Sequence, residues 1–456
     1  MDLRNKKVTV VGMGSSGIDS VLLLERAGAI VSITDSGDDE SVKERAECLA
    51  EKYINLETGR HTESFLEDTE LLVVSPGVEN GALPIRYANE NNIPIISELE
   101  LGYLFCEGTI VAITGTNGKT TVATLLGEIL RSAGIPVNVC GNIGNSLSGE
   151  TGNIKKDTVV ILETSSFQLE RIDSFKPKIS VILNVTEDHL DRYRNFEEYL
   201  DAKKRIFKNQ ETGDIIVLNY DDKNLRDLIK TGKVRSKALY FSMKKKVDGI
   251  YLDRGNIKLS LKNKTKNLMV PGDYKLKGAH NTENVMVSCL VATLLGASPD
   301  AVKKAVKNFK PLAHRFESVA LVGGVEFIDD SKATNIDSTS RALLSLDKPA
   351  ILIAGGKDKN LSYEKVLPAI KKNVKKIILI GETKPKMRKI FKDFVDVREA
   401  DTLPEAVILA YKSASPGESV LLSPMCSSFD MFGDYKERGE VFRRAVGELR
   451  VKDAVD

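Results

Sequence analysis

The sequence predicts an α/β protein with mostly parallel sheets, divided into two or three domains. Short apolar runs alternate with helix-like patterns along most of the chain, as βαβ units require. The chain has 456 residues, roughly three times the length of a typical domain. The alternation also starts afresh three times, with strand-like runs at residues 8–11, 109–113 and 325–327.

Each of the three segments continues the alternation. The first segment reaches about residue 96, and the second continues past the apolar run at 215–217. A helix-poor stretch at 238–270 within the second segment predicts strands and turns. Pro311 marks a boundary before the third segment, whose further strand-like runs lie at residues 350–353, 377–380 and 420–422.

Composition excludes several classes of protein. Hydrophobic residues make up 42% and charged residues 29%, with a net charge of +2, so bulk charge implies no nucleic-acid partner. No apolar run approaches the ~20 residues that span a bilayer, and no signal-peptide layout is present. Five scattered cysteines suggest neither a disulfide framework nor a zinc site. We therefore expect a cytoplasmic protein.

The first strand runs into a glycine turn. Gly12, Gly14 and Gly17 match the dinucleotide-binding fingerprint, and the next strand, residues 30–34, ends at Asp35, where an acid often binds ribose. The turn offers N–H groups to any diphosphate, however. An NAD site, a site for a UDP compound and a turn without a ligand all remain open.

The second segment opens with a strand, a glycine-containing turn and a helix. The strand covers residues 110–113, the turn reads GTNGKT at 115–120, and an amphipathic pattern continues until Gly134. This is the context of a phosphate-binding loop, in which backbone N–H groups and the helix N-terminus face the phosphates.

Two side chains of this loop fit the same chemistry. Lys119 can reach the outer phosphates of ATP, and Thr120 can ligate Mg²⁺. The full pattern requires glycine five residues before Gly118, where Ile113 stands. The match is therefore partial, and a helix start with a chance lysine is the alternative.

Two buried strands end in polar groups that could serve a metal. The strand at 158–163 ends at Glu163, and the strand at 181–183 leads into NVTEDH at 184–189. Open α/β sheets bind ligands at the carboxyl ends of their strands. A strand that merely ends at a surface acid is the alternative for either run.

Several further runs follow one another in a fixed order. They are ETSSFQ at 163–168, HNTEN at 280–284, HRFE at 314–317, DSKATN at 330–335 and LSPMCSSFD at 422–430. With the phosphate loop and residues 184–189, they resemble the motifs of the Mur ligases of bacterial peptidoglycan synthesis. The resemblance covers nearly the whole chain, and the GTNGKT loop is that family's own version.

The resemblance implies three α/β domains. Residues 1–98 would form a Rossmann-like domain that binds a UDP substrate. Residues 99–311 would form a central P-loop ATPase domain, and residues 312–456 a Rossmann-like domain that binds an amino acid. The short first domain and the runs at 330–335 and 422–430 resemble those of the family member that adds D-glutamate.

The implied activity is an ATP-dependent ligation. The carboxylate of UDP-N-acetylmuramoyl-L-alanine would become an acyl phosphate, which the amine of D-glutamate then attacks, with release of ADP and phosphate. Phosphoryl transfer needs positioning and charge neutralisation rather than a protein nucleophile, and the sequence offers no convincing nucleophile arrangement. ATP and Mg²⁺ are the expected cofactors, and we expect a monomer.

The resemblance also assigns individual residues. The catalytic residues would be Lys119, His189 and Lys203. ATP would be bound by Gly115, Thr116, Asn117, Gly118, Lys119, Thr120, Thr121, Asn281, Asn284, Arg315 and Asp330. The UDP substrate would be bound by Ser15, Ser16, Asp35, Ser36, Gly77 and Asn142. The amino acid would be bound by Thr334, Lys359, Ser428 and Tyr435. The metal would be held by Thr120, Glu163, His189 and Lys203.

Some of these assignments have neighbours that compete with them. Lys203 matches the lysine that the family carbamylates, a change that turns a cation into an anionic ligand, and Lys204 is its rival. Lys357 is the rival of Lys359 in the amino-acid pocket. The family often has phenylalanine where this chain has Tyr435.

Three other functions remain as alternatives. A sister Mur ligase or a folylpolyglutamate synthetase would add a different amino acid. An NAD-dependent oxidoreductase would use the glycine turn at 12–17 but leave the ATP motifs unexplained. A non-catalytic ATP sensor would bind the nucleotide without ligation.

Overall fold

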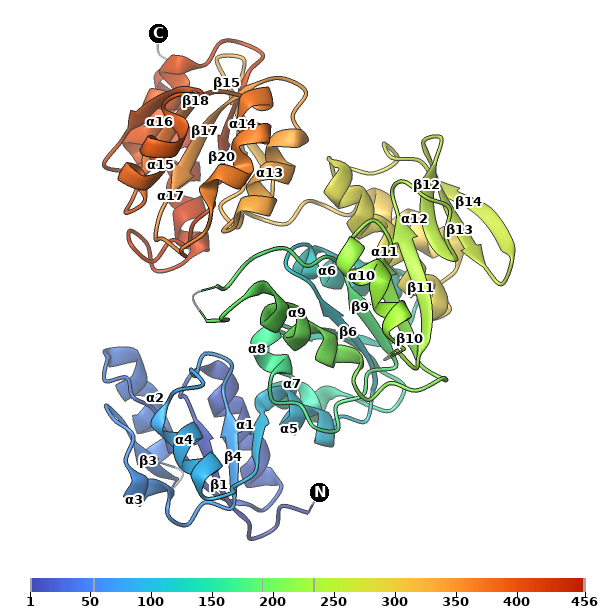
Figure 1. Ribbon diagram of the computed structural model, residues 1–456, viewed down its shortest axis with the longest axis vertical. Helices are drawn as coiled ribbons and strands as arrows, with labels where there is room; N and C mark the ends of the chain where they lie inside the picture. The colour runs from blue at the N-terminus through green and yellow to red at the C-terminus, as the bar shows by residue number, and fades with distance from the viewer. Residues whose placement is uncertain (1, 52–53, 191, 233, 454–456) are drawn as a thin grey trace. The chain divides into compact units, whose positions relative to one another are not determined.

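The computed structural model describes residues 2–51, 54–190, 192–232 and 234–453. Its strands form three sheets (Figure 1), which confirms the predicted α/β class. The chain divides into two compact units. The first comprises Met1–Val185, Glu197–Val270 and Val285–Val306, and the second comprises Thr186–Phe196, Pro271–Asn284 and Lys307–Asp456. The domain limits expected from the sequence stay a prediction.

The first sheet has the strand order β3-β2-β1-β4-β5, with all neighbours parallel. Its strands are β1 Lys7–Val11, β2 Ile30–Thr34, β3 Asn55–Glu57, β4 Leu71–Val74 and β5 Ile95–Ser97. Its helices are α1 Ser15–Arg26, α2 Glu40–Ala50, α3 Glu63–Leu66 and α4 Leu83–Glu90, and α5 Glu98–Phe105 leads out of it. β2 and β4 lie on opposite sides of β1, so the connections that follow β1 and β3 run in opposite directions across the sheet. Such a switch point opens a crevice for a ligand.

The central sheet has the strand order β14-β13-β12-β11-β10-β9-β6-β8-β7. Its strands are β6 Thr109–Thr114, β7 Val137–Gly141, β8 Val159–Glu163, β9 Ile179–Ile182, β10 Ile215–Asn219, β11 Lys237–Ser242, β12 Gly249–Asp253, β13 Asn256–Leu261 and β14 Lys264–Met269. β12, β13 and β14 pair antiparallel, and the other neighbours are parallel. These last strands account for the helix-poor stretch.

Helices and short 3₁₀ turns connect the strands of the central sheet. They are α6 Lys119–Ser132, α7 Leu147–Glu150, η1 Thr151–Asn153, α8 Ser166–Leu169, α9 Phe196–Lys204, η2 Arg205–Phe207, α10 Lys223–Arg226, η3 Asp227–Thr231, α11 Ala279–Leu294 and α12 Pro299–Asn308. β6 lies between β8 and β9, with Ile113 opposite Glu163 and Thr114 opposite Ile182. The loop after β6 therefore starts beside the carboxyl ends of both neighbours.

The third sheet has the strand order β15-β16-β20-β17-β18-β19. Its strands are β15 Glu317–Val322, β16 Val325–Asp329, β17 Ala350–Gly355, β18 Val374–Ile380, β19 Asp396–Glu399 and β20 Ser419–Leu422. Its helical elements are α13 Ile336–Leu344, η4 Tyr363–Val366, α14 Leu367–Asn373, α15 Lys384–Phe391, α16 Leu403–Ser413 and α17 Tyr435–Asp453. β15, which pairs antiparallel with β16, was not predicted. It is an edge strand in which only Val322 is buried, so its short apolar run at 319–322 does not mark it as a core strand.

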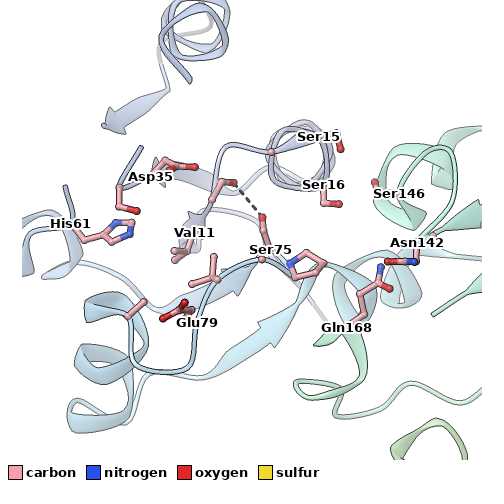
Figure 2. A pocket seen from close by; sticks show the side chains of 18 of the residues that line it. Val11, Ser15, Ser16, Asp35, His61, Ser75, Glu79, Asn142, Ser146 and Gln168 are labelled. Carbon is pink, nitrogen blue, oxygen red and sulfur yellow. Dashed lines mark hydrogen bonds between the residues drawn. The ribbon is translucent and has the colours of Figure 1, made fainter. Parts of the chain in front are cut away.

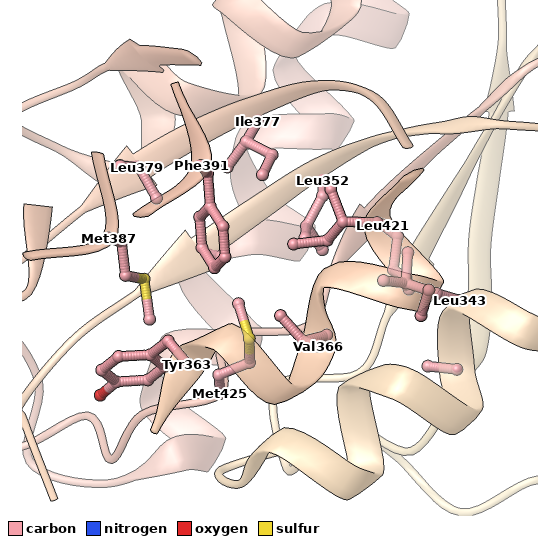
Figure 3. Packing of buried hydrophobic residues seen from close by; sticks show 14 of the residues in the cluster. Leu343, Leu352, Tyr363, Val366, Ile377, Leu379, Met387, Phe391, Leu421 and Met425 are labelled. Atoms are coloured by element: carbon pink, nitrogen blue, oxygen red, sulfur yellow. The ribbon is translucent and has the colours of Figure 1, made fainter. Parts of the chain in front are cut away.

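A dense apolar core holds the third sheet between its helices. On one face Leu352 and Leu379 belong to a cluster with Tyr363, Met387 and Phe391 (Figure 3). A second cluster covers the other face. Each fully buried large apolar side chain contributes about 1.5–3 kcal/mol, so both faces anchor the loops at the strand ends. Among the described residues, no helix is long and apolar enough to cross a membrane.

Candidate active site

The glycine turn after β1 is closed by tight backbone contacts. A Cβ added at Gly17 would lie 1.8 Å from the carbonyl oxygen of Gly12, so the turn requires glycine there. Asp35, at the end of β2, accepts hydrogen bonds from the backbone N–H of Met13 at 2.6 Å and of Gly37 at 2.8 Å. The carboxylate that the fingerprint assigns to a ligand is therefore also the group that fixes the turn.

A pocket of about 950 Å³ opens beside this turn (Figure 2). All the residues predicted to bind the UDP substrate line it, namely Ser15, Ser16, Asp35, Ser36, Gly77 and Asn142. The lining also includes His61, Ser146 and Gln168, for which the sequence predicts no role in binding. Because Asn142, Ser146 and Gln168 follow strands of the central sheet, the pocket joins the first sheet to the central one.

The phosphate loop after β6 has the backbone that the GTNGKT motif predicts. Gly115 adopts φ of +151°, and a Cβ there would lie 3.0 Å from Leu183 Cβ. Gly118, with φ of +88°, caps the N-terminus of α6. Lys119 Nζ donates to the carbonyl oxygens of Gly115 at 2.9 Å and Thr116 at 3.0 Å. The ammonium thus lies over the loop, and Thr120 and Thr121 follow in the first turn of the helix.

Asn184, just beyond β9, holds the loop from the side. Its Oδ1 accepts from the backbone N–H of Asn117 at 2.9 Å, and its Nδ2 donates to the carbonyl of Asn117 at 3.1 Å. Its own carbonyl accepts from the backbone N–H of Thr116 at 2.9 Å. The motif at 184–189 predicts no function for Asn184 by itself, because this contact joins residues far apart in the sequence.

Lys203 lies beneath the same loop. It is 1% exposed, and its Nζ donates to the carbonyl oxygen of Gly115 at 3.1 Å and lies 4.4 Å from the centre of the Tyr199 ring. The rival Lys204 instead pairs with Asp201 at 2.8 Å and is partly exposed. Of the two lysines, only Lys203 faces the phosphate loop.

Glu163 ends β8 next to the loop and fits a magnesium ligand. Its Oε1 accepts from Asn142 Nδ2 at 2.9 Å. Its Oε2 is buried, with no hydrogen-bond partner among the described residues. A buried anionic oxygen without a donor is satisfied by a hard cation, which prefers such ligands. Thr120 lies on the helix that starts at the same loop, so these residues suit a magnesium ion shared with nucleotide phosphates.

His189 belongs to the second compact unit. It has φ of +56°, and its Nε2 lies 3.8 Å from Asp188 Oδ2. Asp188 is buried, accepts from Asn335 Nδ2 at 3.1 Å and pairs with Lys359 Nζ at 3.4 Å. Burial raises the pKa of Asp188, but the charges of Lys359 and His189 outweigh it and hold the pKa below its usual range.

The residues predicted to bind the amino acid also lie in this unit, at Thr334, Lys359, Ser428 and Tyr435. Lys359 is partly buried against Asp188, whereas the rival Lys357 is exposed and its backbone pairs with Ser427. Tyr435 begins α17, and Lys332 Nζ lies 3.9 Å from the centre of its ring. The geometry favours Lys359 as the cation of this site.

The predicted nucleotide residues of the second unit follow short turns. Asp330 is buried and accepts from the backbone N–H of Phe316 and from Ser423 Oγ, both at 3.0 Å. Burial raises the pKa of Asp330 to about 7. Arg315 lies between His314 and Phe316, which both have positive φ. Asp330 is thus a fixed interior group rather than a surface acid.

Two asparagines at the start of α11 are tied to each other. Asn281 Nδ2 donates to the carbonyl oxygen of Lys277 at 2.8 Å, and Asn284 Nδ2 donates to Asn281 Oδ1 at 3.2 Å. Both amides are buried. Their predicted contact with adenine stays a prediction.

Family models cover most of the chain. The Mur ligase MurD-like N-terminal domain matches residues 6–97, the Mur ligase middle domain matches 113–292, and the Mur ligase glutamate ligase domain matches 314–426. The matched ranges follow one another in the order that the resemblance implied.

Curated relatives match at full length. A UDP-N-acetylmuramoylalanine–D-glutamate ligase of Geobacter sp. (strain M21) is 43% identical over 449 residues, covering 98% of each chain. One from Thermoanaerobacter sp. (strain X514) is 41% identical over 455 residues, covering 99% of this chain and all of the relative.

Solved structures share the fold at lower identity. UDP-N-acetylmuramate–alanine ligase of Thermotoga maritima is 20% identical with a TM-score of 0.59, over 97% of this chain and 99% of that one. A MurF ligase of the same organism, solved in complex with ADP, is 18% identical with a TM-score of 0.59, over 98% and 96%. The chain therefore belongs to the Mur ligase family, within the group of UDP-N-acetylmuramoylalanine–D-glutamate ligases.

Proposed function

We propose that this chain uses ATP to join D-glutamate to UDP-N-acetylmuramoyl-L-alanine in peptidoglycan precursor synthesis. The names of its full-length relatives support the choice of both substrates. In the structure, the proposal rests on the hydrogen bond from Asn142 Nδ2 to Glu163 Oε1 at 2.9 Å. Asn142 lines the pocket and Glu163 ends the strand beside the phosphate loop. One contact therefore links the proposed site of the UDP substrate to the proposed site of ATP.

The chemistry follows from the poor reactivity of a carboxylate toward an amine. An oxygen of the substrate carboxylate attacks the γ-phosphorus of ATP, and the bond to ADP breaks. The amine of D-glutamate then attacks the acyl carbon and loses a proton, and phosphate leaves. Lys119 and the backbone N–H groups of the loop stabilise the charge on the transferred phosphoryl group.

Residues around the loop would hold magnesium. Thr120 and Glu163 are the proposed ligands of one ion, which neutralises phosphate charge when bound. Lys203, once carbamylated, is proposed to serve a second ion near the substrate carboxylate, and His189 is a further proposed metal ligand. Carbamylation would replace the Lys203 ammonium by an anion at the underside of the loop.

Residues of the second unit have the other proposed binding roles. Asn281, Asn284, Arg315 and Asp330 are the proposed nucleotide contacts. Lys359 and Ser428 offer a cation and a hydroxyl group to a dicarboxylate. Because Asp188 already pairs with Lys359 at 3.4 Å, the incoming D-glutamate carboxylate would share that ammonium with Asp188. The cytoplasmic location and the monomeric state stay predictions from the sequence.

Phosphate release with a panel of amino acids tests the proposal. With ATP, Mg²⁺ and UDP-N-acetylmuramoyl-L-alanine present, D-glutamate should stimulate release, whereas L-glutamate, L-alanine and L-lysine should not. L-Glutamate is the matched control, because it has the same charge and size as the D-isomer. Stimulation by L-alanine or lysine without stimulation by D-glutamate would assign the chain to a sister ligase.

A further inference from the structure

The two ends of the pocket differ in what lies beside them. Figure 2 shows Asn142 toward one end, Asp35 and His61 toward the other, and Ser15 and Ser16 between them. Under the proposed function, on which this inference rests, the reacting carboxylate of the substrate must approach the Asn142 end. A diphosphate at the N-terminus of α1, near Ser15 and Ser16, then leaves the base at the His61 end.

A hydrogen-bond chain fixes the proton on the His61 ring. Thr34 Oγ1 lies 3.0 Å from Glu57 Oε2, 3.4 Å from the carbonyl oxygen of Arg60 and 2.8 Å from His61 Nδ1. The Glu57 carboxylate and the Arg60 carbonyl only accept hydrogen bonds, and the hydroxyl group has one hydrogen. Thr34 therefore donates to one of these oxygens and accepts from Nδ1–H of His61.

Glu57 is held in place for this role. Its Oε2 accepts from the backbone N–H of Thr62 at 3.0 Å, and its Oε1 accepts from Thr62 Oγ1 at 2.6 Å. In this series of hydrogen bonds, His61 donates to Thr34, and Thr34 donates to an oxygen that can only accept. A neutral imidazole that carries its hydrogen on Nδ1 presents a lone pair on Nε2.

The His61 ring meets the conditions for contact with a ligand. It is partly buried in the lining of the pocket and projects toward the space between Asp35 and Val11 (Figure 2). Burial lowers the pKa of His61 against the opposing charges of Asp35 and Glu57, which favours the neutral ring. Among the described residues, Nε2 has no hydrogen-bond partner, whereas each oxygen of Asp35 already accepts a backbone N–H.

We infer that His61 selects the base of the nucleotide substrate, with Nε2 accepting the N3–H of uracil. Cytosine carries no hydrogen on N3, so two lone pairs would face each other and the pocket would reject it. A buried polar group left without its partner gives larger discrimination than a difference in shape alone. His61 would therefore be a specificity-determining residue of the first sheet.

Calorimetric titration with UDP and with CDP tests this role in the full-length chain. We expect the wild-type chain to bind UDP about tenfold more tightly than CDP, or better. His61→Phe, which keeps a flat ring but removes both nitrogens, should bring the two dissociation constants within about threefold. Ser16→Ala is the matched control, because loss of a diphosphate contact should weaken both ligands and preserve their ratio.

The ring proton can be observed without any ligand. The chain has four histidines, so loss of one ring system in a long-range ¹H–¹⁵N spectrum of His61→Phe assigns His61. We expect the Nδ1–H tautomer, with the Nε2 resonance shifting when UDP is added. The Nε2–H tautomer, or a wild-type UDP/CDP ratio in both His61→Phe and His61→Gln, would overturn the inference. If UDP did not bind the wild-type chain at all, the proposed function itself would fall.

Discussion

The chain uses a strand, a glycine turn and a helix twice within its first unit, and the two turns carry different side chains. The turn at 12–17 leads from β1 into α1, and the loop at 115–118 leads from β6 into α6. Beside the first turn, Ser15 and Ser16 line the pocket, and Asp35 accepts a hydrogen bond from the backbone N–H of Met13. The loop has Lys119 folded over its carbonyl oxygens and Lys203 buried beneath it.

The difference shows which features a phosphate-binding turn needs for phosphoryl transfer in addition to binding. Backbone N–H groups and a helix N-terminus suffice to bind a diphosphate, and both turns have them. Phosphoryl transfer also requires cations and metal ligands around the moving charge. Of the two turns, the loop at 115–118 is the one beside Lys119, Lys203 and the proposed metal ligand Glu163. We therefore expect the turn at 12–17 to bind the UDP substrate and the loop at 115–118 to serve phosphoryl transfer. The hydrogen bond between Asn142 and Glu163 would link the two sites.

The largest expected effect distinguishes the functions of the two turns, because it changes the reaction rate and leaves UDP affinity unchanged. Lys119→Ala should lower the rate of D-glutamate-dependent phosphate release by about a thousandfold or more, because the outer phosphates lose their cation. Affinity for UDP should stay unchanged, since the first turn is intact. Rate assays and calorimetric titration measure the two properties separately. A comparable loss of UDP affinity would contradict the division of labour.

A second test concerns the underside of the reactive loop. Lys203→Ala should lower the rate about 100-fold. Lys204→Ala should stay close to wild type, because the partly exposed side chain of Lys204 pairs with Asp201. The wild-type chain with ¹³C-labelled bicarbonate should give one carbamate signal that Lys203→Ala abolishes. A signal that survives in Lys203→Ala and disappears in Lys204→Ala would reverse the assignment.

A third test breaks the binding turn and spares the reactive loop. Gly17→Ala forces a Cβ to 1.8 Å from the carbonyl oxygen of Gly12, so the turn must open. We expect UDP affinity to fall about thirtyfold, equivalent to about 2 kcal/mol, with little change in binding of an ATP analogue. Gly447→Ala is the control for an added Cβ, because Gly447 lies in α17, outside the turn, and a Cβ there meets nothing within 4 Å. Equal effects of the two substitutions would refute the steric argument.

The smallest effect should appear at the contact between the pocket and the strand end beside the reactive loop. Asn142→Ala removes the donor to Glu163 Oε1 and should weaken Mg²⁺ binding in the presence of ATP about tenfold. Asn145→Ala alters the same turn but leaves Glu163 untouched, because its amide donates to Glu150. Titration of Mn²⁺ by electron spin resonance gives the metal affinity directly. Equal metal affinity in both variants would remove the link between pocket and loop.

Local patterns were enough to predict much of the fold. The two glycine turns and the strand ending at Glu163 are encoded by contiguous residues, so periodicity and glycine spacing identify them. β15 was not predicted because its apolar run at 319–322 is short and, within this edge strand, only Val322 is buried. The order of the motifs, rather than any single motif, then pointed to the family.

The sequence by itself determined the α/β class, the two turns and the residue types around them. Only the tertiary structure decided which side chains serve each turn. Lys203 and Lys204 are adjacent, and their faces differ by about 100° on a helix, so packing alone puts Lys203 under the loop. Asn184 reaches Asn117 across 67 residues, and the proton on His61 is set by Thr34, which lies 27 residues away. Such hydrogen bonds join distant segments, and no local pattern records them.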